Sequence, residues 1–92
     1  MILHSLKIRD EFYQQVRRGS KTFEVRKNDR GFKAGDLVTF NVLSKAMNAT
    51  GDVNTYTDGE VYQITYVLTH DQFPDGIAEG YCVFGIKRMV KE

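Results

Sequence analysis

The sequence has one cysteine, one proline and no tryptophan, and it contains no long run of apolar residues. The single cysteine, Cys82, excludes an internal disulfide and a cysteine-based zinc cluster. No segment approaches the roughly 18 apolar residues that a membrane span needs, so we expect no membrane partner. The chain does not start with a charged segment followed by an apolar run, so nothing indicates secretion and we expect a cytoplasmic protein.

Motifs for cofactors and metals are also missing. There is no P-loop, no glycine-rich nucleotide-binding loop and no Ser/His/Asp arrangement. The two histidines, His4 and His70, lie far apart and have no metal-type spacing with aspartate, glutamate or cysteine. We therefore expect neither a metal nor a cofactor.

Length and composition predict one globular domain over residues 1–92. A chain of 92 residues can bury roughly 60–65% of its unfolded surface and can fold without disulfides or metals. Apolar residues at 41% and charged residues at 27% carry no signature of disorder. The sequence contains no internal repeat, linker or low-complexity tract, so no domain boundary is expected.

The N-terminal part of the chain has a strand pattern followed by a helix pattern. Leu6 and Ile8 alternate with Lys7, which predicts a strand over residues 1–8. Residues 11–18 carry one apolar stripe, two basic residues in the last turn and a glycine stop at Gly19, which is typical of a short helix.

After Gly19 the hydrophobic period changes to two, which predicts a strand. In this interpretation Phe23 and Val25 face the core, while Glu24 and Arg26 point to the other face. A carboxylate and a guanidinium would then lie side by side on the outer surface, with a lysine at the entrance of the strand.

Three further strands are predicted at 37–43, 60–69 and 81–89, separated by polar loops at 44–58 and 70–80. Five strands and one helix without β-α-β alternation predict a mostly β, α+β domain. The expected shape is a small, mostly antiparallel barrel or curved sheet with a helix covering one opening. The expected core residues are Phe23, Val25, Leu37, Val38 or Phe40, Ile64, Val83 and Ile86.

Positive charge is concentrated in one part of the chain. Residues 17–33 hold seven basic and two acidic side chains, a balance of +5, whereas the whole chain carries +1. The rest of the chain therefore sums to −4. A local field of one sign attracts a partner of the opposite sign, although many charge-rich segments are only solvated surface.

The basic stretch also carries a recognisable motif, Gly19-x-Lys21-x-x-Glu24-x-Arg26. This motif resembles the G-x-K-x-x-E-x-R signature of the ASCH domain, a branch of the PUA-like superfamily. Flanking residues from His4 to Ile86, including the string Glu79-Gly80-Tyr81, resemble a family of small bacterial and phage ASCH-like proteins. The resemblance implies a PUA-like small β-barrel, a cleft beside the helix lined by the signature, and a role with nucleic acid or nucleotides.

The leading hypothesis is a binding module for nucleic acid, RNA in particular, or for a nucleotide-like ligand. Arginine offers a rigid donor fork to phosphates or base edges, and lysine offers a mobile point charge. Tyrosines at positions 56, 62, 66 and 81 are candidate stacking platforms, of which Tyr81 is the best placed. The predicted ligand-binding residues are Lys21, Glu24, Arg26, Lys27, Arg30, Lys33 and Tyr81.

The alternative is a small hydrolase acting on a modified nucleoside or a related amide. The signature also resembles amidohydrolases of the superfamily that deacylate modified cytidine, whose nucleophilic threonine stands three residues after the lysine. Here Glu24 occupies that position, and a carboxylate cannot form the same acyl intermediate by the same route. In this alternative Lys21 and Glu24 are the catalytic residues, with Glu24 positioning or deprotonating a water.

Overall fold

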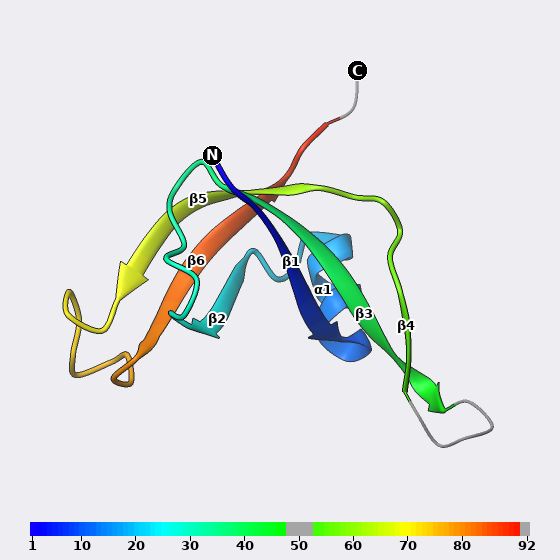
Figure 1. Ribbon diagram of the computed structural model, residues 1–92, viewed down its shortest axis with the longest axis horizontal. Helices are drawn as coiled ribbons and strands as arrows, with labels where there is room; N and C mark the ends of the chain where they lie inside the picture. The colour runs from blue at the N-terminus through cyan, green and yellow to red at the C-terminus, as the bar shows by residue number, and fades with distance from the viewer. Residues whose placement is uncertain (48–52, 91–92) are drawn as a thin grey trace.

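A strongly curved sheet forms the body of the protein, and a short helix lies beside it (Figure 1). The computed structural model describes residues 1–47 and 53–90. Within them the elements are β1 (Leu3–Arg9), α1 (Asp10–Arg18), β2 (Phe23–Lys27), β3 (Leu37–Met47), β4 (Val53–Tyr56), β5 (Tyr62–Thr69) and β6 (Tyr81–Arg88). The predicted fold, mostly β with one helix, is confirmed. No helix of the described residues is long and apolar enough to cross a membrane.

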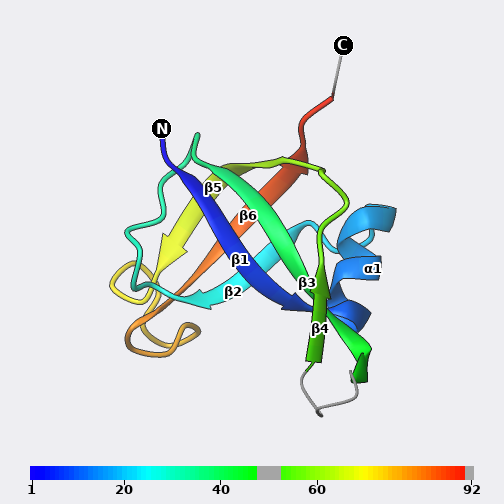
Figure 2. The same ribbon diagram turned by 45° about the vertical axis from the view of Figure 1, so that its right-hand side comes forward.

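The strand order in the sheet is β1-β3-β5-β6-β2, and β4 pairs with β3 off this path. β1 and β3 run parallel, and the other pairings are antiparallel. A parallel pair needs a long crossover connection, and here α1 and β2 lie within it. The sheet curls like half of a barrel, with α1 at one side (Figure 2). Its end strands are β1 and β2, and no ladder joins them in the described part of the chain.

One loop prediction is wrong in part. The polar stretch 44–58 was expected to be a connection, but its first residues extend β3 to Met47, and Val53–Tyr56 form β4. β4 is held by pairing to β3, with Tyr56 opposite Val42 and Thr55 opposite Leu43. Polar residues can occupy such a strand because Asn54, Thr55 and Tyr56 are exposed, so no alternating apolar pattern marks it. Residues 48–52 lie outside the described residues.

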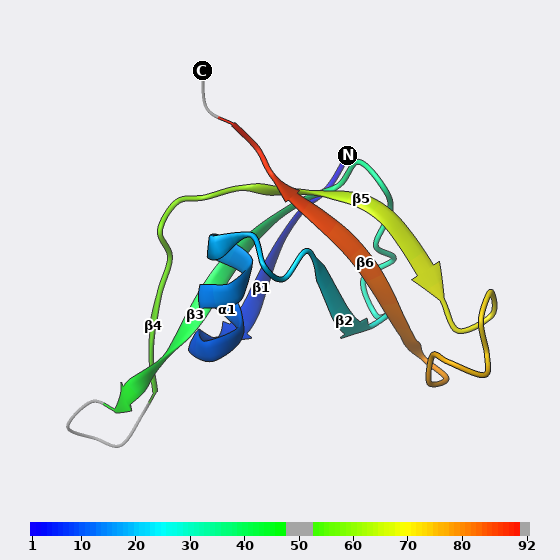
Figure 3. The ribbon, with the colours of Figure 1, turned by 180° about the vertical axis from the view of Figure 1, so that it is seen from behind.

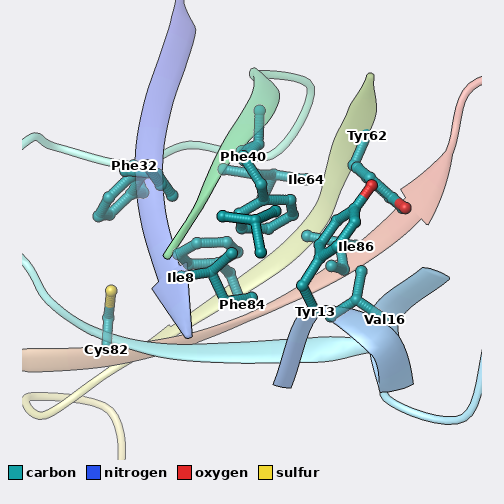
Figure 4. Packing of buried hydrophobic residues seen from close by; sticks show 13 residues of the cluster. Ile8, Tyr13, Val16, Phe32, Phe40, Tyr62, Ile64, Cys82, Phe84 and Ile86 are labelled. Carbon is teal, nitrogen blue, oxygen red and sulfur yellow. The ribbon is translucent and has the colours of Figure 1, made fainter. Parts of the chain in front are cut away.

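The core fills the concave side of the sheet and the inner face of α1 (Figure 4). The helix contributes Tyr13 and Val16, three residues apart and therefore on one face. The predicted core residues Val38, Phe40, Ile64 and Ile86 are buried, and Leu37 and Val83 are half-buried. The buried cluster consists of Leu6, Ile8, Tyr13, Val16, Phe32, Val38, Phe40, Val42, Tyr62, Ile64, Cys82, Phe84 and Ile86.

The predicted orientation of β2 is wrong. Phe23 and Val25 are exposed, whereas Glu24 is buried. The register with β6 explains the inversion, because Glu24 lies opposite Phe84, which is fully buried, and directly paired residues share a face. A one-residue shift would turn every side chain of the strand over. The signature therefore points its carboxylate into the barrel rather than to the outer surface.

A buried aspartate fixes the N-terminal strand to the turn before β3. The Asp36 carboxylate accepts hydrogen bonds from the backbone N–H of Ile2 (3.1 Å), the backbone N–H of Lys33 (3.2 Å) and Nε2 of His4 (2.9 Å). The hydrogen bond from His4 holds the pKa of Asp36 below its ordinary value. The two backbone donors act in the same direction, and burial opposes them.

Asp36→Asn is expected to lower the free energy of unfolding by about 2 kcal/mol at pH 7, because charged hydrogen bonds are lost. A lowered folded-state pKa stabilises the protein above the unfolded pKa, and this stability disappears as pH falls through the folded value. The gap between wild type and Asp36→Asn in urea unfolding should therefore be constant at neutral pH and shrink below about pH 4. A gap that stays constant down to pH 2 would contradict this role.

Candidate functional site

The turn after α1 brings the signature into place. Gly19 adopts a left-handed conformation with φ of 86°, which glycine tolerates best, and it ends the helix. Its N–H donates to the Val16 carbonyl, and the N–H groups of the next two residues donate to the Gln15 carbonyl at 3.0 Å each. This cap turns the chain sharply, so that Lys21 stands at the entrance of β2.

Three residues of the signature form one ion cluster. Nζ of Lys21 lies 2.8 Å from Oε1 of Glu24, and Nε of Arg26 lies 3.2 Å from Oε2. The Glu24 side chain is 6% exposed, whereas the two cations are 20% and 23% exposed. Lys21 Nζ also donates to the Phe23 carbonyl at 2.7 Å. The carboxylate is thus buried and held at both oxygens, with its partners reaching towards solvent.

Two arginines close the gap between the ends of the sheet. Arg26 Nη2 donates to the Lys7 carbonyl at 2.7 Å, and Arg30 Nη1 donates to the Ser5 carbonyl at 2.9 Å. Both carbonyls belong to β1, which pairs with β3 on its other side. The guanidinium groups therefore satisfy edge groups of β1 that would otherwise need water or another strand. Arg26 and Arg30 hold the half-barrel together.

A hollow of about 460 Å³ opens at the C-terminal end of α1, beside β6. Its apolar lining comes from Val16, Tyr62 and Ile86, and Gly19 and Thr22 also border it. Its cationic lining comes from the last turn of the helix, the signature and the end of β6: Arg17, Arg18, Lys21, Lys87 and Arg88. Five cationic side chains around one apolar-floored hollow form an anion-attracting site.

Neighbouring carboxylates neutralise part of this charge. Arg17 pairs with Asp58 at 2.6 Å, and Arg88 pairs more loosely with Glu60 at 3.7 Å. Arg88 Nη2 also donates to the Arg17 carbonyl at 2.6 Å, which satisfies a carbonyl of the last helical turn. These contacts hold the two arginines in place at the rim of the hollow.

A buried tyrosine forms part of the floor of the hollow. Tyr62 lines it and is 2% exposed, and its hydroxyl has no hydrogen-bond partner within the described residues. The neighbouring Tyr13 hydroxyl donates instead to Asp58. Burial, and then this hydrogen bond, raise the pKa of Tyr13 above its ordinary value, so the phenol stays protonated. The Tyr62 phenol raises that pKa as well, because it lies beside Tyr13 in the core (Figure 4).

Apart from the Lys21–Glu24–Arg26 cluster, the structure does not bring the predicted binding residues to one place. Lys21 lines the large hollow, whereas Arg26, Lys27 and Arg30 border a separate hollow of about 160 Å³. Tyr81 borders a third, polar hollow of about 260 Å³. Lys33 is exposed in the turn before β3.

Sequence reasoning missed several residues of the large hollow. Arg17 and Arg18 were counted in the basic stretch but interpreted only as the end of a helix. Lys87 and Arg88 lie at the other end of the chain, and no local signal links them to the signature. Among the predicted stacking residues, Tyr62 is buried and cannot stack on a ligand from the surface.

Fold and hollow together define a small half-barrel β domain with a cationic cleft at the end of a short helix. The chain belongs to the family described as "Domain of unknown function (DUF3850)", which matches residues 3–86. Among curated proteins, none matches the sequence. Within residues 1–47 and 53–90, no three histidine, cysteine, aspartate or glutamate side chains gather in a way that could hold a metal ion.

Proposed function

We propose that this protein is a binding module for nucleic acid, RNA in particular, that holds phosphate groups at the hollow beside α1. The observation that carries the proposal is the convergence of five cationic residues around an apolar-floored hollow. Phosphate contacts supply most of the affinity in such modules. The resemblance to ASCH and PUA-like domains supports the same function, and a cytoplasmic location fits an RNA partner.

Two of the five cations have no ion-pair partner among the described residues. In the part of the chain that the structure describes, neither Arg18 nor Lys87 has a carboxylate within ion-pair distance. Lys21, Arg17 and Arg88 each have one, so their net attraction for an anion is weaker. Arg18 and Lys87 are therefore the primary phosphate contacts. Lys21, which belongs to the signature, adds a weaker attraction for the same phosphates.

The remaining predicted residues have different parts in this proposal. Arg26 and Arg30 are engaged with backbone carbonyls of β1, so their contribution to binding is mainly to hold the site's framework. Lys27 and Lys33 are exposed and add to the field that attracts a polyanion. Tyr81 offers an exposed ring for a base.

Hydrolysis of a modified nucleoside is the alternative, with Lys21 and Glu24 as the reacting groups. The burial of Glu24 next to a lysine that lines the hollow favours it. However, the Glu24 side chain is only 6% exposed and does not itself line the hollow, so a water molecule there has little access to the carboxylate. Binding is the function that this geometry supports better.

The double variant Arg18→Ala/Lys87→Ala is expected to bind a labelled single-stranded RNA at least tenfold more weakly than wild type at low salt. The reason is the loss of two phosphate contacts. Fluorescence anisotropy measures the affinity. Lys7→Ala is the control, because it removes one exposed charge from β1 without touching the hollow. Equal affinities of the double variant and wild type would refute the proposed site.

A further inference from the structure

Three strands expose a face that carries aromatic and aliphatic side chains. Phe23 is 46% exposed, Val25 56%, Tyr66 62% and Tyr81 38%. These residues lie on β2, β5 and β6, which are adjacent in the sheet. They point away from the core because their neighbours along each strand, such as Glu24 and Cys82, point into it. We call this surface the outer face.

The pairing register arranges the outer face in rows. Phe23 and Tyr66 both lie opposite Gly85 of the central strand, one on each side. At about 4.8 Å between strands, the two aromatic residues stand roughly 10 Å apart across a position without a side chain. In the next row, Val25 pairs with Val83, which pairs in turn with Leu68. The two rings therefore stand next to a row of aliphatic side chains on the convex side of the sheet.

The absence of a side chain at Gly85 makes room for Thr65. A Cβ atom at that position would lie 2.5 Å from Oγ1 of Thr65, closer than real contacts allow. Thr65 reaches this place because the register between β5 and β6 shifts between Ile64 and Tyr66. The bulge brings Thr65 beside the central strand and leaves the Tyr66 ring at the surface.

No element covers the outer face in the described part of the chain. The helix packs against β1 and β3, and in Figure 3 β5 and β6 are seen with no helix in front of them. The outward positions of β2, β5 and β6 include two lysines, Lys27 and Lys87, and no carboxylate. A partner that fits this face is negatively charged and presents flat apolar groups.

Lys87 connects the outer face to the hollow, because it lines the hollow and occupies an outward position of β6. We propose that a single strand of nucleic acid passes from the hollow onto the outer face and stacks its bases on Phe23, Tyr66 and Tyr81. Aromatic side chains on a sheet bind unpaired bases in this way, with little dependence on sequence. This inference rests on the proposed function, and it identifies the ligand as unpaired and several nucleotides long.

The double variant Phe23→Leu/Tyr66→Leu tests the stacking. Leucine keeps an apolar side chain but removes the flat ring, so affinity for a labelled oligouridine of about ten nucleotides should fall at least tenfold. Affinity for an abasic strand of the same length should not change, because that probe offers phosphates without bases. Tyr56→Leu is the matched control, since Tyr56 is an exposed tyrosine on β4. Circular dichroism and urea unfolding verify that each variant folds.

The outcomes separate the inference from the proposed function. If the wild-type protein binds neither the oligouridine nor the abasic probe, both the proposed function and the stacking inference are refuted. Wild type that binds oligouridine no better than the abasic strand, or a double variant that binds oligouridine as wild type does, refutes stacking alone. The stacking inference would also be refuted if the wild type sediments as a dimer and Phe23→Ser/Tyr66→Ser sediments as a monomer. The outer face would then join two copies of the chain.

Discussion

Replacing Glu24 by alanine is expected to lower the free energy of unfolding by about 3 kcal/mol. The carboxylate is buried opposite Phe84 and is the shared partner of Lys21 and Arg26. Its removal leaves two cations at a partly buried site without a counter-charge, together with a cavity where the side chain was. Unfolding in urea, followed by circular dichroism, gives the free energy.

Glu24→Gln is the control for shape. It keeps the volume and one acceptor oxygen but removes the charge, so the loss of stability should be smaller. In a binding module this variant should hold or raise the affinity for RNA, because it makes the site more positive. In a hydrolase that uses Glu24 as its acid/base group, turnover of an acylated nucleoside should be abolished while binding remains. A Glu24→Ala variant as stable as wild type would show that the cluster behaves like an exposed ion pair.

Arg26→Ala is expected to destabilise the protein by about 3 kcal/mol. The change leaves Glu24 buried with one cation and leaves the Lys7 carbonyl without its donor. Arg26→Lys should restore little of the lost stability, because one ammonium group cannot reproduce two separate contacts made by different guanidinium nitrogens. Urea unfolding measures both variants.

Arg9→Ala is the matched control for Arg26→Ala. Arg9 pairs with Glu11, but both side chains are largely exposed, so its removal should change the stability by less than about 1 kcal/mol. If Arg9→Ala and Arg26→Ala destabilise the protein equally, the contact of Arg26 with β1 does not hold the half-barrel together.

Much of the fold could be predicted because it depends on local patterns. The helix at Asp10–Arg18 has acidic residues in its first turn, basic residues in its last turn and Gly19 after it. β3, β5 and β6 are rich in β-branched and aromatic residues. β4 could not be predicted in the same way, because pairing with β3 rather than its own composition holds it in the sheet.

The orientation of β2 shows the limit of this reasoning. Alternation in Phe23–Lys27 indicates two faces but does not say which one is inside. Hydrophobicity favoured Phe23 and Val25 as the residues of the inner face, yet the register with β6 places Glu24 in the interior. A buried carboxylate is acceptable there only because Lys21 and Arg26 hold both of its oxygens. The motif was recognisable from the sequence, whereas its inward direction depends on a strand nearly sixty residues away.

The hollow also forms between residues that are far apart in the sequence. Arg88 donates to the carbonyl of Arg17, 71 residues earlier in the chain. No spacing rule links the end of a closing strand to the end of the first helix. The basic stretch at residues 17–33 contains three of the cations that line the hollow: Arg17, Arg18 and Lys21. Only the structure shows that Lys87 and Arg88 line it too, and that Arg26 and Arg30 border a different hollow.

The salt dependence of RNA affinity tests the central claim most directly. The affinity of wild type for a single-stranded oligouridine, plotted as log K against log salt concentration, should fall on a steep line, with about 0.7 in slope for each phosphate neutralised. Arg18→Ala/Lys87→Ala should reduce that slope by about 1.4, and Lys7→Ala should leave it nearly unchanged. A wild-type affinity that does not change with salt, or equal slopes for wild type and the double variant, would contradict phosphate binding at the hollow.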